Sequence, residues 1–131
     1  MIAVDTSALV AIAKTEPEKE PFSDFIALND IVVGAPVLVE ARIVLETFMG
    51  KAARGFLDEL LTRPRVQCVP FTLAMYHVAG DAFSRYGKGR GHPAGLNYGD
   101  CLSYAVAKQL RIPLLFKGDD FIHTDITSAF P

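Results

Sequence analysis

Five acidic residues of this 131-residue sequence are the best candidates for chemistry, because each stands near a boundary between a short apolar run and a helical segment. They are Asp5, Glu40, Asp100, Asp119 and Asp120. Carboxylates gathered at one place without a matching Lys or Arg repel one another strongly. Hard oxygen ligands of this kind suit Mg²⁺ or Mn²⁺. The chemistry of such a site is metal-assisted phosphoryl transfer, in which the ion activates water and stabilises the leaving oxygen.

Each acid also has a purely structural explanation. Asp5 can assist the start of a helix, and Asp100 can complement a helix dipole. Asp119 and Asp120 can be ordinary turn residues. Glu40 is harder to explain in this way, because it lies in an apolar stretch where burying a carboxylate is costly unless something compensates its charge. The acids therefore have to be judged by whether the fold brings them together.

The elements that must position these acids are short apolar strands alternating with helices. The predicted strands are Ile2–Val4, Ile31–Val33, Val66–Val69 and Leu114–Phe116. The predicted helices are Ala8–Lys14, Glu18–Leu28, Pro36–Met49, Ala52–Leu61, a helix capped by Thr72 that runs to Tyr86, and a helix from about Asn97 to Leu110. Alternation of this kind indicates β-α units, hence a parallel sheet with helices on both faces.

Finer expectations concern caps and core positions. Thr6 or Ser7 is a good N-cap for the first helix. The core stripe of the third helix is expected to be Val37, Ala41, Val44, Leu45 and Phe48, and that of the last helix Leu102, Ala105, Val106 and Leu110. The last strand would place its acids in a ligand site if it is central in the sheet. The tail after Phe121 shows no clear element.

Topology predicts that the acids meet at one edge of the sheet. Asp5 and Asp119 follow strands, and Glu40 lies one turn into the helix after the second strand. Asp100 begins a helix instead. In a right-handed β-α fold the helices run antiparallel to the strands, so a helix starts at the carboxyl ends of the strands. All of these positions then converge on the edge where parallel sheets bind ligands.

Composition narrows the class of protein. A net charge of −2 with 50% hydrophobic residues argues against a protein that coats nucleic acid nonspecifically. No apolar run approaches the roughly 20 residues of a membrane span, and the opening residues lack the basic start of a signal peptide. We therefore expect a single domain over residues 1–131, in the cytoplasm and away from membranes. Cys68 and Cys101 lack metal-ligand spacing and are expected to be reduced core residues.

The sequence resembles a known family, the PIN-domain ribonucleases, and most closely the VapC-type toxins of prokaryotic toxin–antitoxin pairs. The resemblance spans essentially the whole chain. It is carried by the opening MIAVDTSALVAI, the helix with Glu40, the stretch LNYGDCLSYAVAKQL and the ending PLLFKGDDF…TDI. The NYGD and KGDDF stretches together are specific, whereas DTSAL alone is weak. The resemblance implies a three-layer α/β/α sandwich and a Mg²⁺-dependent endoribonuclease (with Mn²⁺ as a possible substitute). It also implies a homodimer, a substrate of the tRNA or rRNA class, and an antitoxin whose tail covers the site.

The resemblance also assigns roles to residues. Asp5 and Asp100 would be the main Mg²⁺ ligands, and Glu40 would complete the acidic triad and help to position the attacking water. The fourth acid of the family falls within Gly118–Asp120, and we assign it to Asp119, with Asp120 as the alternative. Thr6 and Ser7 match the polar pair that follows the first Asp and would orient it by hydrogen bonding.

Other motifs are weaker. His77, His92 and His123 show no zinc-ligand spacing. The basic, glycine-rich segment Gly87–Pro93 lacks the Lys-Ser/Thr ending of a Walker loop and follows a helix, not a strand. Its cations can contact RNA phosphates beside the metals or belong to a mobile solvated loop, and both interpretations stay open.

Two rival functions remain. A receiver-like domain also holds an acidic Mg²⁺ pocket, but it needs a phosphate-accepting Asp at the end of a central strand, and the third strand here ends in Val69-Pro70-Phe71. The other rival is an inactive module that only binds a protein partner. Against it, every acid that the family requires is present, and metal-dependent cleavage of RNA distinguishes the two.

Overall fold

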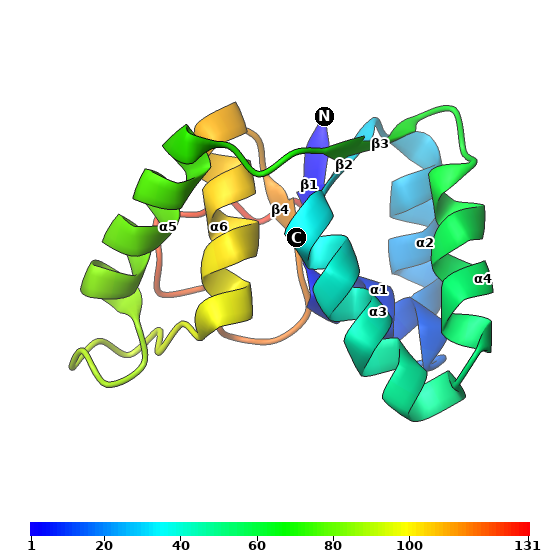
Figure 1. Ribbon diagram of the computed structural model, residues 1–131, viewed down its shortest axis with the longest axis horizontal. Coiled ribbons are helices and arrows are strands. Elements are labelled where there is room, and N and C mark those ends of the chain that lie inside the picture. The colour runs from blue at the N-terminus through cyan, green and yellow to red at the C-terminus, as the bar shows by residue number, and fades with distance from the viewer.

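A four-stranded parallel sheet lies at the centre of the computed structural model, which describes residues 1–131 (Figure 1). The strands are β1 (Ile2–Val4), β2 (Ile31–Gly34), β3 (Val66–Val69) and β4 (Leu114–Leu115). Their order is β3-β2-β1-β4, and every neighbouring pair is parallel. The last strand, β4, therefore lies at an edge of the sheet, so the condition that this strand is central is not met. The two interior strands are β2 and β1, and Ala3 of β1 lies opposite both Val32 and Leu114.

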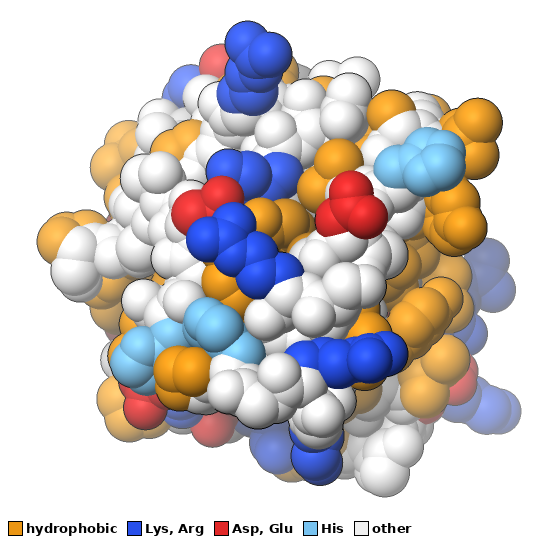
Figure 2. Space-filling view, turned by 90° about the vertical axis from the view of Figure 1, so that its left-hand side faces the viewer, with side chains coloured by type: hydrophobic (Ala, Val, Ile, Leu, Met, Phe, Trp, Pro, Cys, Tyr) orange, Lys and Arg blue, Asp and Glu red, His pale blue; other side chains and the backbone are white.

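Six helices cover the two faces of this sheet. They are α1 (Thr6–Ala13), α2 (Lys19–Leu28), α3 (Ala35–Met49), α4 (Ala52–Leu61), α5 (Leu73–Tyr86) and α6 (Tyr98–Leu110). Helices α5 and α6 lie together on one side in Figure 1, and α1, α2 and α4 lie on the other. The outer surface on the α5 side carries hydrophobic, basic and His side chains next to one another (Figure 2).

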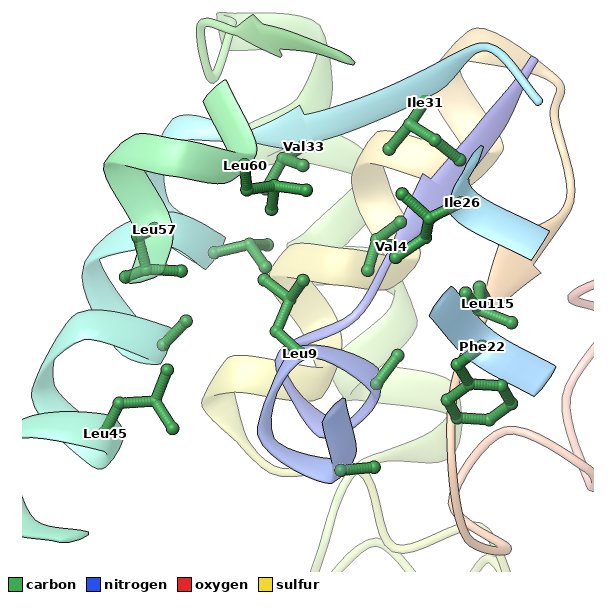
Figure 3. Close-up of a cluster of buried hydrophobic side chains, with 14 of the residues drawn as sticks. Val4, Leu9, Phe22, Ile26, Ile31, Val33, Leu45, Leu57, Leu60 and Leu115 are labelled. Atoms are coloured by element: carbon green, nitrogen blue, oxygen red, sulfur yellow. The ribbon is translucent and has the colours of Figure 1, made fainter. Parts of the chain in front are cut away.

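Alternating side chains of the strands divide the interior into two cores. Ile2 and Val4 of β1 belong to the cluster that α1 to α4 line, and Leu9, Ile26, Leu45 and Leu57 are further members of it (Figure 3). Ala3, between them, faces the cluster built with α5 and α6. This is the period-two pattern of a strand that is buried on both faces. The predicted three-layer α/β/α sandwich is confirmed.

The core faces of two helices differ from the predicted stripes. In α3, Val37, Ala41 and Leu45 are buried, whereas Val44 and Phe48 are exposed. The buried positions follow a spacing of four residues, so one narrow stripe of this helix meets the core. In α6, every residue from Gly99 to Ala107 is buried, while Leu110 is partly exposed. This helix touches the sheet, α3 and α5, and contact on several sides leaves no polar face.

The edge of the sheet and the tail also depart from expectation. Cys68 is exposed, because β3 is the edge strand; only Cys101 is in the core, and both thiols are free. The tail has structure: Ser128 pairs with Leu114 beside β4, and the Phe130 ring packs edge-on against Phe22 and Phe25. None of the helices combines the length and the apolar character that crossing a bilayer requires.

Candidate active site

Asp5 stands at the carboxyl end of β1, an interior strand of the sheet, and caps the helix that follows it. Its Oδ2 accepts a hydrogen bond from the backbone N–H of Ser7 at 3.0 Å, and its own N–H donates to the carbonyl of Leu115 at 2.9 Å. The predicted cap, Thr6 or Ser7, is therefore wrong by one or two residues. Asp5 is only 4% exposed, and these two hydrogen bonds fix it between β4 and the start of α1.

The two hydroxyl residues after Asp5 orient other groups. Thr6 Oγ1 donates to Glu40 Oε1 at 2.5 Å, and Ser7 Oγ accepts from the backbone N–H of Lys117 at 3.0 Å. The expectation that these hydroxyls orient Asp5 is not met; the backbone of Ser7 does so. The hydroxyls instead tie α1 to α3, which carries Glu40, and to the turn after β4, which carries Asp119 and Asp120.

Glu40 is half-buried in the second turn of α3, and its carboxylate packs directly against Gly99. A Cβ atom at Gly99 would collide with all three atoms of that carboxylate. Sequence reasoning missed this role of Gly99. The available signal was a glycine in the first turn of a helix, next to a candidate acid, at a position where glycine is a poor helix former.

Asp100 completes a capping box at the start of α6. Its N–H donates to Asn97 Oδ1 at 2.8 Å, and its Oδ2 accepts from the N–H of Asn97 at 3.1 Å. Burial of this side chain, which is 8% exposed, raises its pKa to about 7, although the hydrogen bond from Asn97 acts in the opposite direction. The charges of Asp120 and Asp5 raise that pKa further. The site is therefore short of positive charge.

The turn after β4 carries Asp119 and Asp120, both exposed. Asp120 is the one whose charge and side-chain hydrogen bonding raise the pKa of Asp100. Lys117 of the same turn does not neutralise the site, because its ammonium pairs with Glu16 and Glu18 at 3.1 Å each. The assignment of the fourth acid to Asp119 stays a prediction.

The donor set suits a hydrated divalent cation more than an enclosed one. No three His, Cys, Asp or Glu side chains are arranged so that they could hold a metal ion by themselves. Mg²⁺, however, is commonly bound by one or two carboxylates and completes its shell with water and phosphate oxygens. Asp5 and Asp100, buried and lacking any cationic partner, provide that number of carboxylates. The residues present therefore fit a Mg²⁺ or Mn²⁺ ion that shares its shell with a phosphodiester.

Known proteins resemble this chain in sequence and in fold. A sequence model of the family described as "PIN domain" matches residues 2–126. Ribonuclease VapC30 of Mycobacterium tuberculosis is 43% identical over 132 residues, which cover 99% of this chain and 100% of that protein. The crystal structure of VapC20 from the same species, described as a Sarcin-Ricin loop cleaving toxin, superposes with a TM-score of 0.80 at 18% identity over the full length of both chains. VapBC2 from Rickettsia felis, crystallised with a fragment of promoter DNA, gives a TM-score of 0.73 at 17% identity and covers 98% of this chain and 96% of that one.

Proposed function

The chain belongs to the PIN-domain family, among its VapC ribonucleases, and on this premise we propose that residues 1–131 form one PIN domain that cleaves RNA with a divalent cation held by Asp5 and Asp100. The observation that carries the proposal is the buried Asp100 carboxylate, whose pKa is raised to about 7 first by burial and then by neighbouring acids. A cation that binds there would neutralise the carboxylates, so the uncompensated negative charge of the site favours cation binding. When bound, Mg²⁺ or Mn²⁺ lowers the pKa of water and stabilises charge on the leaving oxygen.

The acidic residues of the site then have separate roles in the proposed reaction. Asp5 and Asp100 present their oxygens from two helix starts whose capping hydrogen bonds fix the carboxylates. Glu40, held between Thr6 and Gly99, is the acid that would orient the attacking water and accept its proton. This role requires the carboxylate to lie within hydrogen-bond reach of that water. We propose Asp120, in place of Asp119, as the fourth acid, because its charge acts on Asp100.

We further propose that the chain is the toxin of a toxin–antitoxin pair, acts in the cytoplasm, and cleaves a tRNA or rRNA. Exposed apolar side chains on α3, including Ile43 at 62% exposure and Phe48 at 54%, support docking of a protein antitoxin. Leu9 of α1 is buried and takes no part in this surface. Two copies are expected to form a homodimer, and sedimentation of the purified protein tests this.

Single substitutions Asp5→Asn, Glu40→Gln and Asp100→Asn test the catalytic proposal. Residues that act as one catalytic unit give non-additive losses, so each change should remove nearly all Mg²⁺-dependent cleavage of total cellular RNA while the fold persists. The matched control is Asp58→Asn, an exposed acid paired only with Arg54 on α4. Near-normal turnover by Glu40→Gln would contradict the proposal, and mapping the new RNA ends in the wild-type reaction identifies the substrate.

Toxicity tests the biological role. Expression of the wild-type chain alone should arrest growth, and co-expression of the inhibitor encoded beside it should restore growth. The inactive-module alternative predicts harmless expression and no metal-dependent cleavage. Membership of the PIN-domain family leaves no support for the receiver-like alternative.

A further inference from the structure

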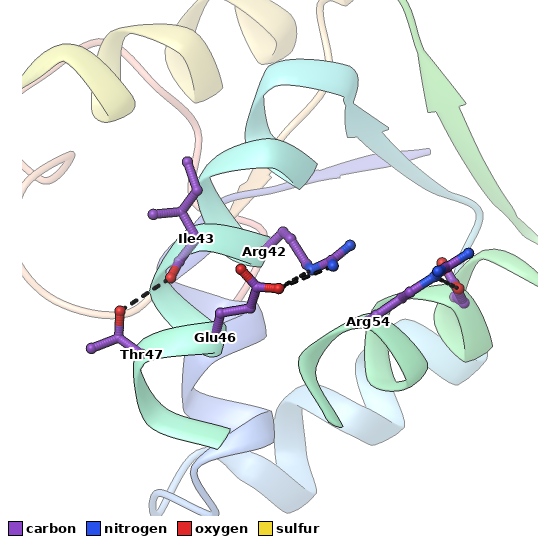
Figure 4. A network of polar contacts seen from close by, with 6 residues as sticks. Arg42, Ile43, Glu46, Thr47 and Arg54 are labelled. Atoms are coloured by element: carbon purple, nitrogen blue, oxygen red, sulfur yellow. Dashed lines mark hydrogen bonds and ion pairs between the residues drawn. The ribbon is translucent and has the colours of Figure 1, made fainter. Parts of the chain in front are cut away.

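Three cations without a carboxylate partner lie close together in the sequence, at the end of α5 and in the connection that leads to α6. Six of the thirteen Lys and Arg residues form ion pairs with carboxylates, as Arg42 does with Glu46 and Arg54 with Asp58 (Figure 4). Three of the seven that lack a carboxylate partner, Arg85, Lys88 and Arg90, lie within six residues of one another. The segment from Ser84 to Tyr98 contains no acid at all. A cluster of exposed cations that form no ion pair with a carboxylate is the electrostatic signature of a site for an anionic ligand.

The connection between α5 and α6 has a firm base. Gly87 pairs with Leu96 in a β-bridge. The N–H of Lys88 donates to the carbonyl of Leu96, and the N–H of Leu96 donates to the carbonyl of Tyr86, both at 2.9 Å. Leu96 is fully buried, whereas the three cations are exposed. The base therefore fixes where the cations project, and their charged ends remain available to a ligand.

Two of the cations are also held by aromatic rings. The guanidinium of Arg85 lies 4.7 Å from the centroid of Tyr86, and that of Arg90 lies 5.3 Å from the centroid of Phe83. Stacking on a ring uses the face of a guanidinium and leaves its N–H edge free to donate to phosphate oxygens. The side chains are thus partly ordered before any ligand binds, which lowers the entropy cost of binding.

The same connection leads directly into the acidic site. Leu96 is followed by Asn97, the N-cap of α6, and then by Gly99 and Asp100. In Figure 1 the connection approaches the first turn of α6 from one side, and the turn after β4 passes the same end of the helix. On the surface of the α5 side, Lys, Arg and His side chains are spread over the face among hydrophobic and acidic ones (Figure 2). Cations beside a metal-binding acidic site can hold a polyanionic chain across it.

We propose that Arg85, Lys88 and Arg90 bind phosphates of the RNA strand next to the scissile bond and so position that strand over the acids. The proposal rests on the proposed ribonuclease function and adds a binding surface to it. Contacts of this kind set the register of a nucleic acid without reading its bases. They hold substrate and transition state alike, so they lower KM without raising kcat.

Charge-removing variants Arg85→Gln, Lys88→Gln and Arg90→Gln test the surface, with Arg54→Gln as the control. The probes are two fluorescein-labelled single-stranded RNAs of unrelated sequence, titrated in EDTA so that no cleavage occurs. Each lost phosphate contact should reduce the slope of log Kobs against log salt by about 0.7 between roughly 50 and 200 mM. The affinity for both RNAs should fall equally, and the triple variant should lose about 2 in slope. Melting temperatures should stay unchanged, because the three side chains are exposed.

Two results would overturn the inference: an unchanged salt slope in the triple variant, or a loss of affinity for only one of the RNAs. Cleavage kinetics give a second reading, in which the triple variant should raise KM severalfold and keep the wild-type kcat with Mg²⁺. The two proposals fail separately. A wild-type protein that never cleaves RNA, yet loses salt slope in the triple variant, refutes the catalytic proposal alone. Normal cleavage with unchanged slope and KM refutes the surface alone.

Discussion

The carboxylate of Glu40 lies against the backbone of Gly99, in space that any other side chain at Gly99 would need. This contact joins α3 to the first turn of α6, one residue before Asp100. The same carboxylate accepts a hydrogen bond from Thr6 at the start of α1. Three helices that begin near one edge of the sheet are thereby set in position around a single acid.

Gly99→Ala should therefore reduce cleavage without unfolding the protein. Alanine is a better helix former than glycine by about 1 kcal/mol, which offsets part of the cost, about 1–3 kcal/mol, of inserting a methyl group into filled space. The net change in unfolding free energy should be small. The displaced group is the end of the Glu40 side chain, so kcat should fall by at least about tenfold, as expected when one acid of the site is misplaced.

Gly55→Ala is the matched control for this prediction. Gly55 is also helical, but a Cβ there meets nothing within 4 Å. The control should raise the free energy of unfolding by about 0.5–1 kcal/mol and leave cleavage unchanged. If Gly99→Ala behaves like Gly55→Ala in both denaturation and turnover, the contact with Glu40 does not govern the site.

Thr6→Val should weaken catalysis through Glu40. Valine has nearly the shape of threonine but cannot donate to Glu40 Oε1, and hydrogen bonds to charged groups contribute about 1.5–3 kcal/mol. We expect cleavage to fall by about tenfold or more, with the secondary structure measured by circular dichroism unchanged. Thr6→Ser keeps the donor and should retain most of the activity. Equal turnover of the valine and serine variants would mean that packing on Gly99 suffices to hold Glu40.

The sequence predicted the sheet, the helices and the edge where the acids meet, because these depend on short-range patterns. Strand and helix limits follow from apolar period and from Pro and Gly, and β-α topology then places Asp5, Glu40 and Asp100 together. Whether these acids act as assigned is left to the variants described above.

Long-range contacts were not predictable in this way. The Ser128–Leu114 pairing and the edge-on packing of Phe130 against Phe22 join residues with no shared local pattern. The partners of Thr6 and Ser7 are likewise 34 and 110 residues away. Local propensity suggested that these hydroxyls cap a helix, whereas the tertiary structure uses them to join segments.

Asp120→Asn should impair the enzyme more than Asp119→Asn. Of these two acids, only Asp120 contributes to the raised pKa of Asp100, so removing its charge should lower the pKa of Asp100 in metal-free protein and weaken metal binding. The side-chain pKa of Asp100 can be followed by NMR titration of each variant, and metal affinity by calorimetry. A larger loss of cleavage in Asp119→Asn would restore the original assignment of the fourth acid.

Metal-free protein should become more stable as pH falls from about 8 to about 5. The folded pKa of Asp100 is raised to about 7, mainly by burial and then by Asp120 and Asp5, while its unfolded pKa is about 3.9. The unfolded state then binds fewer protons than the folded state between these values, so stability decreases as pH rises through this window. The penalty is complete above the folded pKa and is relieved below it, until the protonation of other carboxylates unfolds the protein.

Asp100→Asn isolates this effect. An amide keeps an oxygen that can accept from the N–H of Asn97, as Asp100 does at 3.1 Å, but it carries no charge to bury. Without metal at pH 7.5 the variant should melt at a higher temperature than the wild type, and its melting temperature should change less between pH 8 and pH 5. Mg²⁺ or Mn²⁺ should raise the wild-type melting temperature by mass action and the variant's much less. Melting curves of both proteins in EDTA and in metal decide between two roles. If Asp100→Asn lowers the metal-free melting temperature and retains the full metal-induced rise, Asp100 serves only the capping box of α6, and the metal site lies elsewhere.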